Sequence, residues 1–181
     1  AASDVYKRQM LEQMAELVLD AGAMDVLVAD TPAKIKDAWA ARSSFLEAIM
    51  HETKLLDECD VVVPVNKIAD YLDFVNKTGE DCGLVIKSFG HAGDGNLHIY
   101  QCSNDLEEEE FKSRVDKFFE IIYKEATNCG GLVSGEHGIG SGKIKYLVDS
   151  VGETNMALME GIKRVFDPKM ILNPGKVCYR L

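Results

Sequence analysis

The sequence has few basic residues, a single tryptophan, four prolines and no long apolar run. Its 181 residues carry 20 Lys and Arg against 30 Asp and Glu, so the formal net charge is −10. An acidic chain without a basic stripe argues against nucleic acid and anionic membranes as partners. No apolar stretch approaches the ~20 residues that cross a bilayer. We therefore expect neither a nucleic-acid partner nor a membrane span.

Cysteine pairs of the C-x-x-C type are also missing. The five cysteines are scattered along the chain, at positions 59, 82, 102, 129 and 178. An odd and unclustered set is typical of reduced, buried thiols in a cytoplasmic protein. This pattern predicts a cytoplasmic location and argues against a cysteine-based zinc or iron–sulfur site.

The remaining composition is globular, with 46% hydrophobic and 28% charged residues. The length suits one domain of ordinary size or two small ones. Residues 1–9 show no apolar period, and residues 4–9 resemble the translation of a transposon-end adaptor used in DNA library preparation. We expect 1–9 to be a non-native segment, 10–181 to be the domain, and the natural polypeptide to extend further at its N-terminus.

Apolar periodicity predicts an alternation of helices and strands. Helices are expected over 10–21, 32–51, 66–78, behind a capping box at 105–108, and over about 143–149 and 154–166. Strands are expected over 24–29, 60–64, 84–89 and 97–102. Directly joined strands mixed with helices predict an α+β fold, an antiparallel sheet with helices on one face and a C-terminal helical segment.

Three of the four histidines lie in two glycine-rich segments, 90–98 and 134–140. His91 and His98 flank a predicted hairpin turn and can face each other across it. Two ordinary imidazoles at a strand end are the simpler alternative, but the glycines and the second segment favour a metal site. Glu136 would complete a set of two histidines and one carboxylate with open positions, suited to Zn, Fe or Mn.

His137 follows Glu136 directly in this irregular segment. Histidine is the common general base near neutral pH, so His137 is the natural base if Glu136 binds the ion. The alternative for the segment is a surface turn without function.

Arg42 falls within the apolar stripe of its predicted helix, three residues from both Trp39 and Phe45. A charge there is costly unless it is paired. An arginine that binds a substrate carboxylate would explain it. An ordinary ion pair or a side chain reaching to solvent explains it equally well.

Three ordered motifs carry a family resemblance: G-H-x-G-D-G-N-L-H at 90–98, S-G-E-H-G-I-G at 134–140, and D-P-x-x-I-L-N-P-G-K at 167–176. Together they resemble the C-terminal half of the FAD-dependent 2-hydroxyacid dehydrogenases. This group includes the glycolate oxidase flavoprotein subunit, D-lactate dehydrogenase and D-2-hydroxyglutarate dehydrogenase. The resemblance, over residues 10–178, implies a ferredoxin-like cap domain, with FAD bound mainly by an N-terminal domain that this chain lacks.

The resemblance also implies site residues. It assigns metal binding to His91, His98 and Glu136, proton transfer to His137, the substrate carboxylate to Arg42, and the loop that returns to the flavin to Asn173. Tyr100 and Glu58 depart from relatives that act on a dicarboxylate, which have Asn and Lys there. Both departures argue for a small monocarboxylate such as D-lactate or glycolate.

We therefore expect the substrate- and metal-binding part of an FAD-dependent enzyme that oxidises a small D-2-hydroxy acid to the 2-oxo acid. The chain alone should be inactive. An electron-transfer flavoprotein or an iron–sulfur subunit would accept the electrons. The alternatives are a stand-alone metal-binding module without flavin, hydrolase-like or regulatory, and a purely structural subunit.

Overall fold

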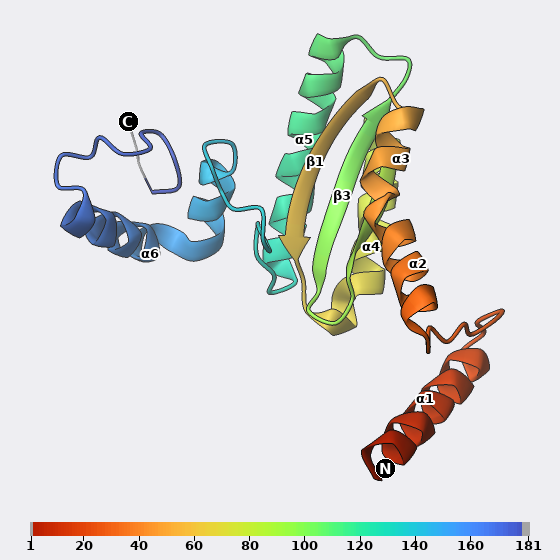
Figure 1. Ribbon diagram of the computed structural model, residues 1–181. Coiled ribbons are helices and arrows are strands. Elements are labelled where there is room, and N and C mark those ends of the chain that lie inside the picture. The colour runs from red at the N-terminus through yellow and green to blue at the C-terminus, as the bar shows by residue number, and fades with distance from the viewer. Residues whose placement is uncertain (1, 179–181) are drawn as a thin grey trace. The chain divides into compact units, whose positions relative to one another are not determined.

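The computed structural model describes residues 2–178, with side chains from residue 5 onward (Figure 1). The chain divides between Ala48 and Ile49 into two compact units, each of which is described by itself. None of the described helices combines the length and apolar character that a membrane span requires. All five cysteines are free thiols, and all but Cys129 are buried.

The first unit is helical, and it differs from the prediction in three places. Helix α1 spans Ala2–Asp20, so it begins before residue 10, and the origin of residues 1–9 stays a prediction. The strand predicted over 24–29 is wrong, because this segment is irregular. Short apolar runs are ambiguous, and a strand forms only where another strand supplies hydrogen bonds.

The helix predicted over 32–51 is confirmed at its start and divided at Ser44. Helix α2 spans Pro32–Ser43, with Thr31 as N-cap, its hydroxyl accepting the Lys34 N–H at 3.3 Å. Helix α3 spans Phe45–Glu52. The hydroxyls of Ser43 and Ser44 donate to main-chain carbonyls four residues earlier. Such back-bonding bends helices, which accounts for the division.

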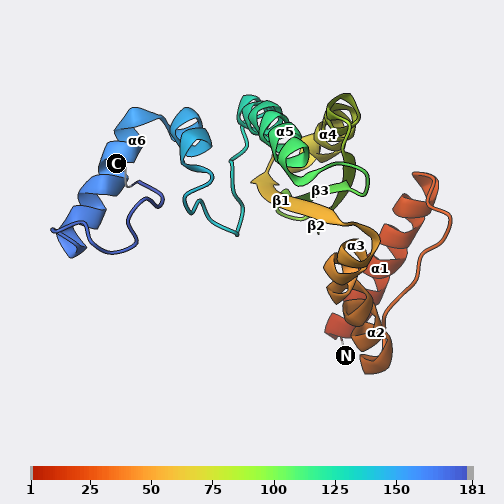
Figure 2. The ribbon, with the colours of Figure 1, turned by 90° about the horizontal axis from the view of Figure 1, so that it is seen from above.

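The second unit contains a three-stranded antiparallel sheet in the order β1-β3-β2, which confirms the α+β class. Its strands are β1 (Leu55–Val62), β2 (Val85–His91) and β3 (Asn96–Ser103). Its helices are the short η1 (Val65–Lys67), α4 (Ile68–Cys82), α5 (Glu108–Asn128) and α6 (Ile144–Phe166). Helices α4 and α5 lie on the same face of the sheet (Figure 2).

Several predicted boundaries change. Strand β1 begins at Leu55 rather than at residue 60, because residues 55–59 also pair in register with the central strand β3. The capping box is wrong: the N-cap of α5 is Glu107 without a side-chain bond, and Ser103 Oγ accepts the preceding N–H groups of Asp105 and Leu106. The two predicted C-terminal helices form α6, interrupted at Gly152 by a φ of 76°.

The hydrophobic core lies between the sheet and helices α4 and α5. Strand β3 contributes Leu97 and Ile99 to it, whereas His98 and Tyr100 alternate onto the opposite face. The helices contribute the apolar faces that the sequence predicts, with Tyr71, Val75, Phe111, Val115, Phe118, Ile122 and Ala126 buried. Helices α4 and α5 cover one face of the sheet, so His98 lies on the face opposite these helices.

Candidate functional site

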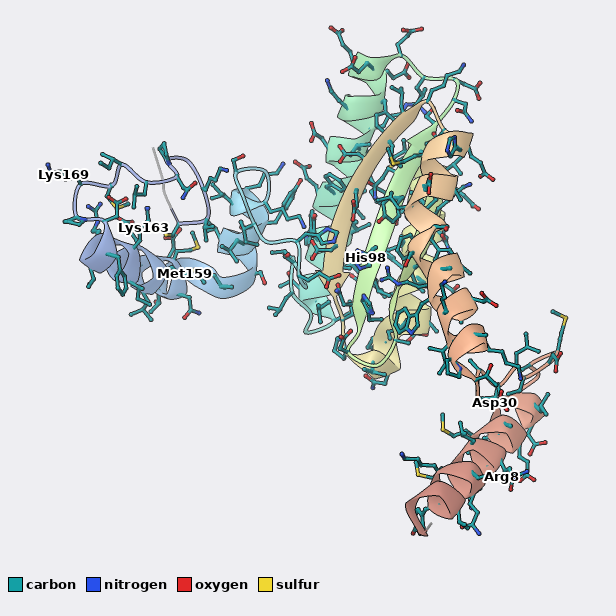
Figure 3. All side chains as sticks on the ribbon, viewed as in Figure 1. Arg8, Asp30, His98, Met159, Lys163 and Lys169 are labelled. Carbon is teal, nitrogen blue, oxygen red and sulfur yellow. The ribbon has the colours of Figure 1, made fainter. Side chains whose placement is uncertain are left out.

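His98 is the centre of a cluster of titratable side chains on the sheet face opposite α4 and α5 (Figure 3). Only 4% of the residue is exposed. Across the sheet it is paired with Asp60 of β1 and Phe89 of β2. Within the described part of the chain, neither of its buried ring nitrogens makes a hydrogen bond. Buried polar atoms are nearly always partnered, so this ring is suited to a ligand.

The Nε2 side of His98 faces the other two predicted metal ligands. Glu136 Oε1 lies 2.9 Å from His98 Nε2, without the alignment of a hydrogen bond, and 3.8 Å from His91 Nε2. The three potential ligand atoms lie within 4.8 Å of one another. The structure thus brings together His91, His98 and Glu136, as the sequence predicts, and leaves His91 and Glu136 partly open to solvent.

The Nδ1 side of His98 faces Glu58 and His137. Glu58 Oε1 lies 3.6 Å from His98 Nδ1 and 3.1 Å from His137 Nδ1. The hydroxyl of Tyr100, the cross-strand partner of Glu58, donates to the same oxygen at 3.2 Å. These two residues were singled out in the sequence only as departures from a family pattern. Their direct contact makes Glu58 a member of the site that sequence reasoning missed.

Asp60 shapes the loop that carries Glu136 and His137. Its buried Oδ2 accepts the N–H groups of Gly135, Glu136 and His137 at 2.7, 2.8 and 3.0 Å. Lys143 forms an ion pair with Oδ1. Burial alone would raise the pKa of Asp60, but the bonds from Lys143 and these N–H groups outweigh it and hold that pKa well below its usual range. The loop sends consecutive side chains to opposite sides of His98.

The loop is also tied to the sheet beside Asp60. Val62, at the end of β1, exchanges two main-chain hydrogen bonds with Leu132, at 2.8 and 3.0 Å. A Cβ atom on Gly135 would lie 2.3 Å from Asn96 Oδ1, which explains the glycine at this position. From the sequence, Asp60 was assigned no role. The local signal for it is only a carboxylate directly before an apolar run, residues 61–63, and that pattern says nothing of its partners in the loop.

The other two predicted site residues are not among the clustered groups of the described residues. Arg42 is half-buried on α2 in the first unit, so its proposed contact with a substrate carboxylate stays a prediction. Asn173 is exposed in the segment after α6, where it adopts a left-handed φ of 47°. Its proposed role at the flavin also stays a prediction.

Comparison with known proteins identifies the family. Residues 1–177 match the family model described as FAD linked oxidases, C-terminal domain. The chain belongs to this family. The match confirms the resemblance inferred from the three sequence motifs, and the three-stranded sheet with helices is consistent with such a domain.

Curated relatives of this FAD-linked oxidase domain are longer proteins. The chain is 59% identical over 179 residues to a D-lactate dehydrogenase of Anaerostipes hadrus, covering 99% of this chain and 38% of the relative. It is 34% identical over 169 residues to the glycolate oxidase subunit GlcD of Bacillus subtilis (strain 168), covering 92% and 35%. It is 31% identical over 172 residues to a mitochondrial D-2-hydroxyglutarate dehydrogenase of Danio rerio, covering 94% and 31%. The chain therefore spans roughly a third of the length of these relatives.

Proposed function

We propose that this chain is the substrate- and metal-binding domain of an FAD-dependent dehydrogenase that oxidises D-lactate or glycolate to the 2-oxo acid. One observation carries the proposal: His91 and Glu136 converge on the buried imidazole of His98, and His137 lies beside it. The names of the relatives support the substrate class. Membership of an FAD-linked family favours this function over a stand-alone metal module or a purely structural subunit.

The residues present fit a divalent ion such as Zn, Fe or Mn. Two imidazoles and one carboxylate oxygen are a common donor set for such ions. The Nε2 of His98 makes no hydrogen bond and lies 2.9 Å from Glu136 Oε1. When bound, the ion would polarise the substrate hydroxyl as a Lewis acid. The roles of the chain's own residues are to hold the ion with His91, His98 and Glu136 and to orient the substrate beside His137.

Proton transfer falls to His137. Its Nδ1 faces Glu58, which leaves Nε2 to take the proton of the substrate hydroxyl. Arg42 would bind the substrate carboxylate, and Asn173 would lie in the segment next to the flavin. FAD itself, held mainly by a part of the protein outside this chain, supplies the redox chemistry. Electrons would then pass to an electron-transfer flavoprotein or an iron–sulfur subunit.

The Glu58–Tyr100 pair supports a small monocarboxylate as substrate. Tyr100 is buried, and the ring of Phe89 stacks on it with centroids 5.1 Å apart. This packing leaves the anionic oxygen of Glu58 beside the two histidines. A second carboxylate on the substrate would be repelled there, because like charges at short range disfavour binding.

Elemental analysis of the purified chain tests the metal site. We expect about one divalent ion per chain if the ligands are preorganised. His98→Ala should remove most of it. His51→Ala is the matched control, since His51 is exposed on α3 and outside both glycine-rich segments. Unchanged metal content in His98→Ala would overturn the proposal.

Kinetics of the full-length enzyme test the division of roles. His137→Ala should lower kcat by ~10²–10⁴-fold with the metal retained, because positioned proton transfer contributes about that much. Glu136→Ala should lose the metal. Arg42→Ala should mainly raise KM, since a carboxylate contact exists in both ground and transition states. Loss of metal in His137→Ala with retention in Glu136→Ala would show that these two roles are exchanged.

The 181-residue chain on its own should bind no FAD tightly and should oxidise no 2-hydroxy acid. Absorbance of the purified chain in the flavin region and a dye-linked activity assay measure both properties. Stoichiometric flavin in this preparation would place the cofactor site within the chain and contradict the proposed division between domains.

A further inference from the structure

We propose that Glu58 is a positioning residue whose carboxylate fixes the rings of both His98 and His137 as the Nδ1–H tautomer, leaving both Nε2 atoms for the ion and the substrate. The inference rests on the proposed function and extends it to a residue outside the metal set. A single oxygen, Glu58 Oε1, lies on the Nδ1 side of both rings, 3.1 Å from His137 Nδ1 and 3.6 Å from His98 Nδ1. The contact with His98 is a charge contact rather than a hydrogen bond. A carboxylate at Nδ1 stabilises a proton on that nitrogen. For His98 this holds once its Nε2 and Glu136, which lie 2.9 Å apart, both bind the ion.

Glu58 is itself held in place. It lies on β1 opposite Tyr100 of β3, whose hydroxyl donates to Oε1 at 3.2 Å. The Tyr100 ring is buried and stacked on Phe89, so the donor is fixed by packing. A side chain held by a rigid donor can in turn orient the groups it contacts, which flexible carboxylates do poorly.

The neighbouring carboxylates are committed elsewhere. Asp60 Oδ1 lies 4.0 Å from His137 Nδ1, but this carboxylate is bound by Lys143 and by three main-chain N–H groups of the loop. Glu136 is on the Nε2 side of His98. Glu58 is therefore the described carboxylate placed to set the tautomer of both rings.

The same three residues, Glu58, His98 and His137, also lie close enough together to hold a cation. An ion at that position would need a lone pair on Nδ1 of both rings, which is the opposite tautomer. Because His98 would then give both nitrogens to ions, it would have to lose its second proton. The two arrangements therefore differ in histidine tautomer and in metal stoichiometry, and both quantities can be measured.

The test uses the ¹⁵N-histidine-labelled 181-residue chain, with and without Zn²⁺. Long-range ¹H–¹⁵N spectra report the tautomer of each ring, and calorimetric titration with Zn²⁺ reports affinity and stoichiometry. In the unaltered chain with Zn²⁺ bound we expect Nδ1–H on both His98 and His137, and one Zn²⁺ per chain. Glu58→Gln should bind Zn²⁺ about 10–100-fold more weakly, as for loss of a group that orients a ligand, and His137 should populate the Nε2–H form.

Tyr100→Phe is the second variant, because it frees Glu58 without removing its charge and should shift both readouts in the same direction by less. Glu80→Gln, which removes an exposed charge on α4, is the control and should change neither. Unaltered tautomers and affinity in Glu58→Gln, with metal loss in His98→Ala, would overturn this inference alone. Retention of metal in His98→Ala would overturn the proposed function. Binding of two Zn²⁺ per chain would show that Glu58, His98 and His137 hold a cation, and it would also overturn this inference.

Discussion

Two buried aspartates, Asp60 and Asp167, each pair with a lysine and hold a loop that carries predicted site residues. Asp60 binds N–H groups 75 to 77 residues further along the chain, in the loop of Glu136 and His137. Asp167 binds the N–H groups of Ile171 and Leu172, only four and five residues ahead, at 3.1 and 2.9 Å. The first loop thus depends on the sheet for its shape, whereas the second, next to Asn173, is shaped by its own sequence.

Asp60→Asn should have the largest effect, because it leaves Lys143 without its anionic partner and weakens the acceptor of three N–H groups. Removing one member of a buried pair typically lowers the free energy of unfolding by about 3–5 kcal/mol. Urea denaturation of the chain measures it. Zn²⁺ affinity should fall as well, since Glu136 is no longer held. A variant with the stability and Zn²⁺ affinity of the unaltered chain would show that the loop keeps its shape without the sheet.

Gly135→Ala should have a smaller effect on the same loop. The new Cβ would lie 2.3 Å from Asn96 Oδ1 and 2.8 Å from Val62 Cγ2, so the loop must move away from the sheet. Overpacking of this kind costs about 1–3 kcal/mol and should weaken Zn²⁺ binding. Gly161→Ala is the control, because Gly161 lies in α6 with open space around it. Equal Zn²⁺ affinity in the two variants would contradict a close fit between the loop and β1.

Asp167→Asn should have a still smaller effect, confined to the turn after α6. Amide hydrogen exchange at Ile171 and Leu172 should become faster, because their shared acceptor is weakened. Zn²⁺ affinity should be unchanged, in contrast to Asp60→Asn. A loss of Zn²⁺ affinity comparable to that of Asp60→Asn would mean that the two loops are coupled.

Acid should release the Asp167 turn. Burial raises the pKa of Asp167, but the N–H of Leu172, the Lys163 ammonium and the N–H of Ile171 outweigh it and lower that pKa. A lowered pKa means that the stabilisation is complete above the unfolded value of about 3.9 and is lost as the pH falls through the folded value. Exchange protection of Leu172 should therefore decrease in that acid range. In Asp167→Asn, which lacks the titrating carboxylate, the exchange protection of Leu172 should not decrease over the same pH range.

The contrast between the two aspartates explains what the sequence could predict. The hairpin of β2 and β3 was predicted to within about two residues, because turn residues and alternating side chains are local signals. This placed His91 and His98 face to face. The apolar face of α5 was predicted for the same reason.

What was missed depends on partners far along the chain. The first part of β1, which contains Asp57 and Glu58, is a strand because β3 lies beside it. The apolar run at 24–29 is irregular despite its composition. Glu58 and Asp60 belong to the site only through the register of β1 against β3 and through a loop more than 70 residues later. No local pattern carries that information.

The long reach of Asp60 also sets the order in which the site can form. During synthesis all three strands emerge before residue 134, so the sheet can fold before the loop exists. The loop then closes onto a template that is already present, and the proposed metal ligands come together at that step. A ribosome-bound chain halted before Ser134 should display a paired sheet with no tight affinity for a divalent ion, and assembly of the site should be a late event in the life of the nascent protein.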